Sequence, residues 1–204
     1  MSYVTFLVDD DEAVLTALAR LLRAAGYETR AFASAQHFLA EYDASVPGCI
    51  ILDLAMPGLD GLGLQRKLGE KYPNSPVIFL TGTGDIARSV RAMKAGAVDF
   101  LTKPVNGKQL LAAVERARQK DEAAREARRD LEEFALRMAK LTPRERQVLD
   151  HVVLGCLNKQ IAATLGTVEK TIKVHRGRVM AKLEVRSVAE LVRLTERGGL
   201  RPTA

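Results

Sequence analysis

The fold is decided by a short stretch of the chain, Cys49-Ile50-Ile51-Leu52-Asp53-Leu54-Ala55-Met56-Pro57-Gly58. Four apolar residues run directly into a carboxylate, and Pro57 and Gly58 end the run. A short apolar run between turn residues is typical of a central strand that is buried on both faces. Asp53 is therefore expected at the carboxyl end of this strand, where open α/β sheets place reactive groups. A buried ionised carboxylate needs a cation or a chemical role, although Asp53 merely capping the next loop is the simpler alternative.

The segments around this strand alternate between strand-like and helix-like patterns. Strand-like runs occupy Tyr3–Val8, Tyr27–Phe32, Val77–Leu80 and Val98–Leu101. Helical spacing is found near Val14–Leu22, Ala35–Tyr42, Leu62–Lys71 and Asp85–Ala95, and in a helix that opens near Asn106. Five strand–helix repeats predict a doubly wound, five-stranded parallel sheet of the α/β class, because parallel strands need crossover helices that cover both faces.

Polar side chains follow four of the predicted strands at the points where the strands end: Asp9 and Asp10, Asp53, Thr81, and Lys103. The carboxyl ends of parallel strands share one edge of the sheet, so we expect these side chains to converge. Neighbouring carboxylates repel each other unless a cation lies between them, and hard oxygen ligands with room for water favour Mg²⁺. The sequence therefore predicts a magnesium site at this edge.

The same residues suggest phosphoryl chemistry. Asp53 is interpreted as a nucleophile that accepts a phosphoryl group. Thr81, which is followed by the small Gly82, can donate a hydrogen bond to a phosphate oxygen, and Lys103 can neutralise the added charge. Pro104 is expected to fix the loop after Lys103, with a cis peptide bond as one way of doing so.

The motifs that carry these residues resemble the receiver domain of two-component response regulators, over roughly residues 1–120. They are Val8-Asp9-Asp10-Asp11, Leu52-Asp53-Leu54-Ala55-Met56-Pro57-Gly58-Leu59-Asp60-Gly61, Thr81-Gly82, Lys94-Ala95-Gly96-Ala97 and Phe100-Leu101-Thr102-Lys103-Pro104. The resemblance implies that Asp53 is phosphorylated by a histidine kinase. It also implies a Mg²⁺ ion held by Asp10, Asp53 and the carbonyl of Ala55, with Asp9 reached through water. Phe100 resembles the aromatic residue whose rotation is coupled to the Thr81 hydroxyl.

Charge and composition separate the two ends of the chain. Residues 1–106 hold 10 Lys and Arg against 12 Asp and Glu, whereas residues 141–204 hold 12 against 6. A basic tail behind an acidic front indicates different partners, and nucleic acid is the leading candidate for the tail. The sequence has no long apolar run, so neither a signal peptide nor a membrane span is expected. The two cysteines, Cys49 and Cys156, fit no zinc spacing and favour a reduced, cytoplasmic setting.

Residues 107–140 contain no proline and no glycine after Gly107, which predicts one long connecting helix. Its first apolar positions are expected to dock on the sheet: Leu110, Leu111 and Val114. The middle, Lys120–Asp130, is charged all round and is expected to be solvated. A second apolar stripe follows at Leu131, Phe134, Met138 and Leu141. That stripe can form a short coiled coil between two chains or pack against the tail, and the absence of sustained heptads favours packing.

The tail is predicted to be all-helical, with four helices. Thr142-Pro143-Arg144-Glu145 supplies an N-cap, a proline at the first helical position and a capping-box glutamate, and this helix ends at Gly155. Asn158 is expected to cap a short second helix that ends at Gly166. Thr167 is expected to cap a third that runs to about Leu183, and residues 187–195 form the fourth. Two short helices joined through a glycine turn are typical of a helix-turn-helix.

The third helix has two different sides when it is projected at about 100° per residue. Its core face is predicted to hold Val168, Ile172, Val179 and Leu183. The opposite side carries Lys170, Lys173, Val174, Gly177, Arg178 and Ala181. That side is basic and holds no acidic residue, whereas a solvated helix usually mixes both signs. We interpret it as a face that enters the DNA major groove, with a merely solvated face as the alternative.

The tail resembles the LuxR-type DNA-binding domain from residue 138 to about residue 198. The matching residues are Leu141-Thr142-Pro143-Arg144-Glu145, Asn158-Lys159-Gln160-Ile161-Ala162, Thr171-Ile172-Lys173-Val174-His175-Arg176, Met180, Lys182-Leu183 and Arg186-Ser187. The residues expected to contact DNA are Asn158, Lys159, Lys170, Thr171, Lys173, Val174, His175, Arg176 and Arg178. For His175, a phosphate contact and a structural hydrogen bond stay open. Gly177 departs from the pattern, since relatives often carry a side chain there that faces the groove.

The order of the two domains resembles the FixJ group of regulators. It implies a phosphorylation-controlled transcription factor, not an enzyme, with a receiver at 1–120, a helical linker at 121–140 and a DNA-binding domain at 141–204. The resemblance also implies a homodimer on phosphorylation, formed through the fourth helix, fifth strand and fifth helix. Such a dimer is expected to read paired half-sites in promoter DNA, to act as an activator and to engage RNA polymerase.

Two other classes of function compete with this interpretation. An aspartyl-phosphate hydrolase of the haloacid dehalogenase type needs a second aspartate shortly after the nucleophile, but Asp53 is followed by Leu54, Ala55 and Met56. A regulator with a degenerate receiver that is never phosphorylated is disfavoured because Asp53, Thr81 and Lys103 are all intact.

Overall fold

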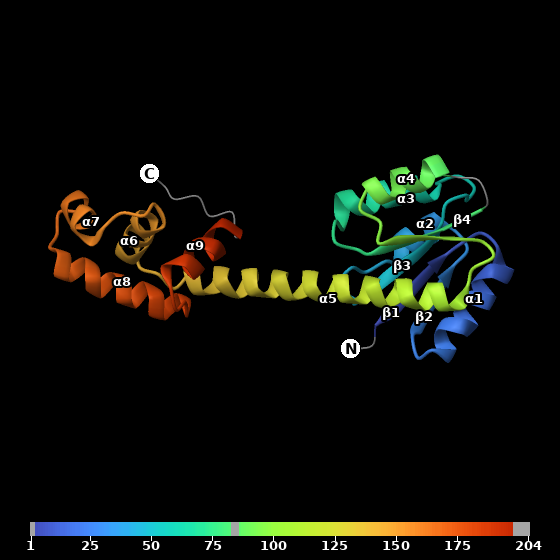
Figure 1. The fold of residues 1–204 in the computed structure, drawn as a ribbon, viewed down its shortest axis with the longest axis horizontal. Helices are drawn as coiled ribbons and strands as arrows, with labels where there is room; N and C mark the ends of the chain where they lie inside the picture. Colours follow the sequence, from blue (N-terminus) through green and yellow to red (C-terminus); the bar gives the residue numbers. More distant parts are fainter. Residues whose placement is uncertain (1–2, 83–85, 198–204) are drawn as a thin grey trace. The chain divides into compact units, whose positions relative to one another are not determined.

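The computed structural model describes residues 3–82 and 86–197. Contacts between residues divide the chain into two compact units, Met1–Arg125 and Glu126–Ala204. Unit 1 contains the sheet, and unit 2 is helical in the part that the structure describes (Figure 1). None of the described helices is long and apolar enough to cross a membrane.

Unit 1 is built on the predicted five-stranded parallel sheet. The strands are β1 (Val4–Val8), β2 (Glu28–Phe32), β3 (Gly48–Asp53), β4 (Val77–Thr81) and β5 (Asp99–Thr102), in the order β2-β1-β3-β4-β5. All of the pairings are parallel, with Val8 opposite Leu52, and Asp53 opposite Leu80. β3 is central and every one of its residues is buried, as its continuous apolar run predicts.

Helices cover both faces of this sheet. α1 (Glu12–Ala24) and the first part of α5 (Gly107–Met138) pack on one face, around Leu7, Ile51 and Leu80. α2 (Ala35–Glu41), α3 (Gly61–Lys71) and α4 (Ile86–Lys94) belong to the other face, which holds Phe6 and Phe79 (Figure 1). Alternate residues of the three central strands, β1, β3 and β4, therefore enter different cores, as the doubly wound topology requires. The helix start expected at Asp85 lies outside the described residues.

Short polar side chains begin the helices that follow the reactive edge of the sheet. Asp11 accepts hydrogen bonds from the backbone N–H groups of Ala13 and Val14 and so caps α1. Asp60 caps α3 through the N–H of Gly63. At the start of α3 only glycine fits, because a Cβ atom on Gly61 would lie 2.4 Å from the carbonyl oxygen of Asp53. The helix start is thereby brought directly against the end of β3.

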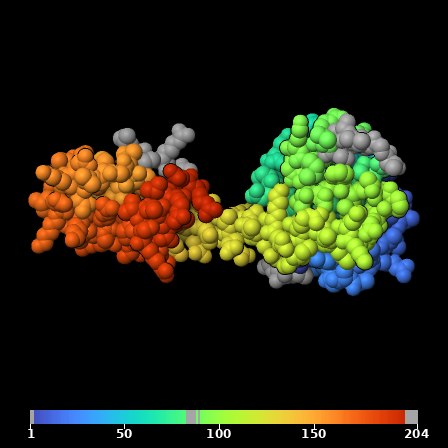
Figure 2. Space-filling model, viewed as in Figure 1, coloured from blue at the N-terminus to red at the C-terminus, as the bar shows by residue number. Residues whose placement is uncertain are grey.

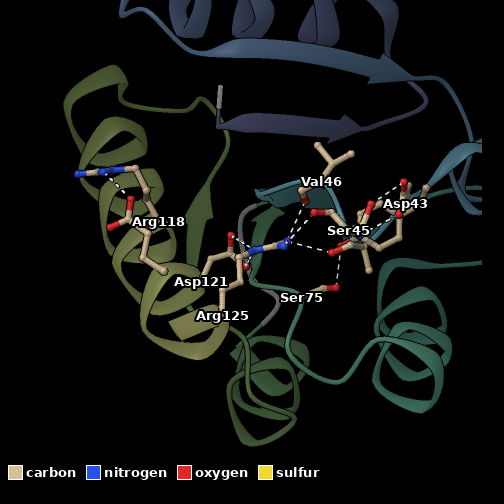
Figure 3. Close-up of polar contacts among 10 residues, drawn as sticks. Asp43, Ser45, Val46, Ser75, Arg118, Asp121 and Arg125 are labelled. Carbon is tan, nitrogen blue, oxygen red and sulfur yellow. Dashed lines mark hydrogen bonds and ion pairs between the residues drawn. The ribbon is translucent and has the colours of Figure 1, made fainter. Parts of the chain in front are cut away.

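The prediction of one long connecting helix is confirmed by α5, and Leu110 and Val114 are fully buried against the sheet. The prediction that Lys120–Asp130 is solvated is wrong at Asp121 and Arg125, whereas Lys120, Glu122 and residues 128–130 are exposed as expected. Asp121 is buried, and the guanidinium of Arg125 donates to both oxygens of that carboxylate and to the carbonyls of Ala44, Ser45 and Val46 (Figure 3). The prediction of solvation rested on charge alone, but a charged residue whose hydrogen-bonding groups all have partners is stable in a buried position.

Unit 2 contains the predicted four-helix tail: α6 (Pro143–Val153), α7 (Asn158–Thr164), α8 (Glu169–Leu183) and α9 (Val188–Arg197). The capping box of Thr142 and Glu145 is present. Two predicted caps are wrong by one residue, because Leu157 occupies the N-cap position of α7 and Val168 that of α8. Neither side chain has an oxygen, so neither N-cap residue caps its helix; in α7 the Gln160 side chain instead accepts from the N–H of Leu157 at 2.7 Å.

The core of unit 2 joins the end of α5 to α6, α7, α8 and α9. Phe134 and Met138 of α5 are buried in the same cluster as Val148, Val152 and Leu183. The second apolar stripe thus packs against the tail, which is the alternative that the sequence favours. Ile172, Val179 and Leu183 form the inner side of α8, as predicted. Val168 does not, because it stands before the first turn of α8 and is 65% exposed. The helical projection failed there because Val168 lies outside the helix.

Candidate functional site

Three carboxylates meet at the carboxyl edge of the sheet in unit 1. One oxygen from each of Asp9, Asp10 and Asp53 can be chosen so that all of these atoms lie within 4.8 Å of one another. Asp9 and Asp53 are 2% and 4% exposed, whereas Asp10 is open to solvent. The predicted convergence is therefore present, because β1 and β3 are neighbours and end side by side.

Lys103 links the two buried carboxylates. Its Nζ atom lies 2.6 Å from Asp9 Oδ2 and 3.1 Å from Asp53 Oδ1. Burial lowers the pKa of Lys103, but the hydrogen bonds and charges of Asp9 and Asp53 outweigh burial and leave that pKa raised. Burial raises the pKa of Asp9, and the hydrogen bond from Lys103 offsets only part of this effect. A protonated Lys103 thus holds Asp9 and Asp53 together at the site.

Backbone hydrogen bonds fix the direction of these side chains. Asp9 Oδ1 accepts from the N–H of Asp11 at 3.0 Å, and Asp53 Oδ2 accepts from the N–H of Ala55 at 3.1 Å. The N–H of Lys103 donates to the carbonyl of Thr81 at 2.8 Å, which sets the lysine beside the end of β4. The peptide bond between Lys103 and Pro104 is cis. Asp53 Oδ1 therefore points at the lysine, while Oδ2 is held by the backbone.

Three further predicted residues lie on or directly after strands of the same sheet. Thr81 is buried at the end of β4, and its hydroxyl donates to the carbonyl of Gly82 at 3.1 Å. Phe100, on the edge strand β5, is 41% exposed. Ala55, two residues after Asp53, is exposed between the buried Leu54 and Met56.

The donor set of this site fits a divalent cation. Three carboxylates lie close together and of these only Asp9 and Asp53 contact Lys103, and like charges at this spacing are stabilised when a cation lies between them. The ligand atoms are all carboxylate oxygens, which hard cations prefer, and the exposed Asp10 leaves room for water. The acidic cluster is thus consistent with a divalent metal site.

The second candidate site is the outer side of α8 in unit 2, and α8 forms the lower edge of that unit in the space-filling view (Figure 2). All of the residues predicted to face outward are exposed: Lys170, Lys173, Val174, Gly177, Arg178 and Ala181. Val174 is 48% exposed although it is apolar. Lys159, the second residue of α7, is exposed as well. The surface is basic and carries an apolar contact point, which suits phosphates and base edges.

The remaining predicted DNA residues are less open. Thr171, His175 and Arg176 are half-buried. The Nδ1 atom of His175 is buried and has no hydrogen-bond partner among the described residues, so the structural hydrogen bond considered for it is not seen at this nitrogen. Arg176 Nη1 donates to Asn158 Oδ1 at 2.9 Å, a contact between α8 and α7 that no sequence pattern indicated.

An ion pair between Lys182 and the buried Glu145 holds α8 against α6. Lys182 Nζ lies 2.6 Å from Glu145 Oε2 and also donates to the carbonyl of Lys140. The hydrogen bond from Lys182, assisted by those from Thr142, lowers the pKa of Glu145 to about 2. Arg144 donates to the carbonyl of Leu165 at the end of α7. These contacts position α7 and α8 relative to α6, and the sequence showed only the capping box among them.

Known families match the parts of the chain that contain both candidate sites. The family profile of the response regulator receiver domain matches residues 5–115, and that of the bacterial regulatory proteins of the luxR family matches residues 139–195. The first match contains every residue of the acidic cluster together with Thr81, Phe100 and Lys103. The second contains α6, α7 and α8.

Relatives are similar to this chain over nearly its whole length. The chain is 43% identical to Nodulation protein W of Bradyrhizobium diazoefficiens over 197 residues, which covers 97% of this chain and 87% of that one. It is 41% identical to the transcriptional regulatory protein FixJ of Rhizobium meliloti, covering 98% of each chain. The solved structure of the response regulator StyR is similar with a TM-score of 0.81 at 44% identity, over 97% of this chain and 100% of that one.

Proposed function

Because this chain belongs to the response regulators that join a receiver domain to a LuxR-family DNA-binding domain, we propose that phosphorylation of Asp53 controls how it binds promoter DNA. The family consists of transcription regulators rather than enzymes, and its two domains imply a sensor kinase and DNA as partners. The observation that carries the proposal is the buried Asp53 at the end of β3, which Lys103 links to Asp9.

In this proposal, a sensor histidine kinase donates the phosphoryl group to a carboxylate oxygen of Asp53. Asp53 Oδ2 already accepts a backbone N–H, whereas Oδ1 faces Lys103, so Oδ1 is the oxygen we assign as nucleophile. Lys103 then neutralises part of the charge on the new acyl phosphate. Asp10, Asp53 and the carbonyl of Ala55 are the proposed ligands of Mg²⁺, and Asp9 reaches the ion through water. A bound Mg²⁺ ion supplies positive charge that offsets the charge of the phosphoryl oxygens.

The switch is proposed to act through Thr81 and Phe100. In the present structure the Thr81 hydroxyl donates to a backbone carbonyl and Phe100 is partly exposed. A phosphoryl group on Asp53 offers this hydroxyl a stronger, charged acceptor. The hydroxyl then turns toward the phosphate and Phe100 turns inward, which shifts an existing equilibrium of the receiver. The shifted state forms a homodimer through α4, β5 and α5.

The proposed dimer places two DNA-binding units on paired half-sites of a promoter. Lys173 and Val174 are assigned to base reading, and the other outward cations to phosphates. The residues proposed to contact DNA are Asn158, Lys159, Lys170, Thr171, Lys173, Val174, His175, Arg176 and Arg178. The protein is proposed to act in the cytoplasm as an activator that engages RNA polymerase. The proposed domain limits are 1–120, 121–140 and 141–204.

The test is phosphorylation of the full chain by acetyl phosphate with Mg²⁺, followed by DNA footprinting. Asp53→Asn is expected to abolish labelling, while the control Asp43→Asn, on the loop after α2, labels as the wild type does. The beryllium fluoride complex is expected to shift the mass in light scattering from monomer to dimer. Equal labelling of Asp53→Asn refutes the phosphoacceptor assignment. An unchanged mass with the mimic bound refutes phosphorylation-driven dimerisation.

A further inference from the structure

The contact between Asn158 and Arg176 joins the two helices of the helix-turn-helix through their polar side chains. Asn158 is the first residue of α7, and Arg176 lies in the middle of α8. Arg176 Nη1 donates to Asn158 Oδ1 at 2.9 Å. The two residues are 18 positions apart, so this is a tertiary contact and not a feature of either helix alone.

The chemistry of the pair fixes the orientation of the amide. A guanidinium has only donors, so Asn158 must turn its oxygen toward Arg176 and its NH₂ group away. Among the described residues, no other hydrogen bond is made by the Arg176 guanidinium or by the Asn158 amide nitrogen. The remaining N–H groups of the Arg176 guanidinium and the Asn158 amide therefore have no hydrogen-bond acceptor among the described residues.

The charge around the pair is positive. Lys159 is adjacent to Asn158 in the chain, and Lys173 lies three residues, or about one helical turn, before Arg176. Both lysines are exposed, and no ion pair to a carboxylate is seen for Arg176 within the described residues. A half-buried guanidinium without a carboxylate favours an anion as its missing partner.

We propose that Asn158 and Arg176 act as one coupled phosphate clamp, in which Asn158 positions the Arg176 guanidinium and both side chains donate to the same DNA phosphate. The inference rests on the proposed function, since it requires that unit 2 binds DNA. It goes further, because it makes the effects of the two residues interdependent. Two independent phosphate contacts, in contrast, have effects that multiply.

A purely structural hydrogen bond between α7 and α8 makes a different prediction. Its loss lowers the thermal stability of unit 2 and leaves the salt dependence of DNA binding unchanged. A phosphate contact changes the salt dependence, because each neutralised phosphate releases counterions and contributes about 0.9 to the slope of log K against log salt. The salt slope therefore distinguishes the phosphate clamp from a purely structural hydrogen bond.

The experiment is a double-mutant cycle in the full chain. The wild type, Asn158→Ala, Arg176→Ala and the double variant are titrated against a random-sequence duplex at several salt concentrations, and each is melted by circular dichroism. Arg176→Ala is expected to reduce the salt slope by about one unit. Asn158→Ala alone is expected to weaken binding by roughly five- to tenfold, as for loss of a positioned contact. The double variant is expected to bind within about twofold of Arg176→Ala.

Lys159→Ala provides the matched control, because Lys159 is exposed and next to Asn158 but takes no part in the hydrogen bond between Asn158 and Arg176. Its effect is expected to multiply with that of Arg176→Ala. If Arg176→Ala loosens α8, Arg176→Met retains an unbranched stem and replaces it in the cycle.

Two results overturn the clamp: multiplying effects of Asn158→Ala and Arg176→Ala, or a salt slope that Arg176→Ala leaves unchanged. These outcomes are distinct from failure of the proposed function, in which the wild type itself binds no duplex at any salt concentration.

Discussion

The guanidinium of Arg125 and the carboxylate of Asp121 lie one turn apart on α5, with Arg125 Nε at 3.0 and 2.9 Å from the two carboxylate oxygens. The remaining nitrogens of Arg125 donate to the carbonyls of Ala44, Ser45 and Val46, each at 2.9 Å (Figure 3). One side chain thus pins α5 to the loop between α2 and β3. This loop lies at the amino edge of the sheet, opposite the acidic cluster.

Arg125→Ala is expected to destabilise unit 1 by roughly 3–5 kcal/mol, because it leaves the buried Asp121 carboxylate unpaired. Arg128→Ala is the control, since Arg128 is exposed and pairs only with the exposed Glu132 among the described residues. It is expected to cost less than about 1 kcal/mol. Urea unfolding followed by circular dichroism measures both, and equal losses in the two variants contradict the assigned role of Arg125.

The ion pair of Glu145 with Lys182 predicts acid sensitivity of unit 2. The pKa of Glu145 is lowered from an ordinary value of 4.5 to about 2, mainly by the hydrogen bond from Lys182 and then by those from Thr142. A lowered pKa in the folded state stabilises above pH 4.5, and this stabilisation is lost as the pH falls from about 4.5 to about 2. Glu145→Gln is therefore expected to be less stable than the wild type at pH 7.

This difference is expected to shrink steadily as unfolding is measured at lower pH through that window. Glu126→Gln, at an exposed position of α5, is the control and is expected to follow the wild type throughout. A stability difference between Glu145→Gln and the wild type that is the same at pH 7 and pH 2.5 excludes the ion pair as its cause.

Val168→Ser is expected to stabilise α8. Val168 occupies the N-cap position with extended backbone angles, φ −100 and ψ 153, and its side chain is 65% exposed. A serine there can accept a hydrogen bond from a free N–H of the first turn, which typically contributes about 1 kcal/mol. Thermal unfolding compares Val168→Ser with Val168→Ala, which removes the same methyl groups without adding an acceptor. Equal midpoints of thermal unfolding for the two variants contradict the prediction that a side-chain acceptor at this N-cap stabilises α8.

Base reading by α8 is tested with Lys173→Ala and Val174→Ala. Each is expected to reduce the preference for operator over random DNA, by about 1–3 kcal/mol for a lost base contact and at the low end for the valine methyl. Lys159→Ala is expected to weaken both duplexes alike. Titrations against the two duplexes at several salt concentrations decide the matter. If Lys173→Ala weakens both duplexes equally, its base-reading role is withdrawn and a phosphate contact takes its place.

The sequence by itself determined the sheet and its reactive edge. The run Cys49–Leu52 is apolar at every position, so it required a strand covered on both faces, and parallel strands required crossover helices. Once the topology was known, Asp9, Asp53 and Lys103 had to meet, because strand ends share an edge. Local patterns also predicted the capping box of Thr142 and the outward basic side of α8.

Only the tertiary structure decided which polar groups become partners across the chain. Arg125 bonds to carbonyls about 80 residues away, and Asn158 meets Arg176 across 18 residues. Local periodicity treats Arg125 and Asp121 as solvated charges, because it records the polarity of a residue and not the groups that fold against it. Val168 was placed in the core for a related reason: one residue of error at a helix start removes a side chain from the helical face. Burial of a charge depends on donors and acceptors brought together by packing, and these are fixed only when the whole chain is folded.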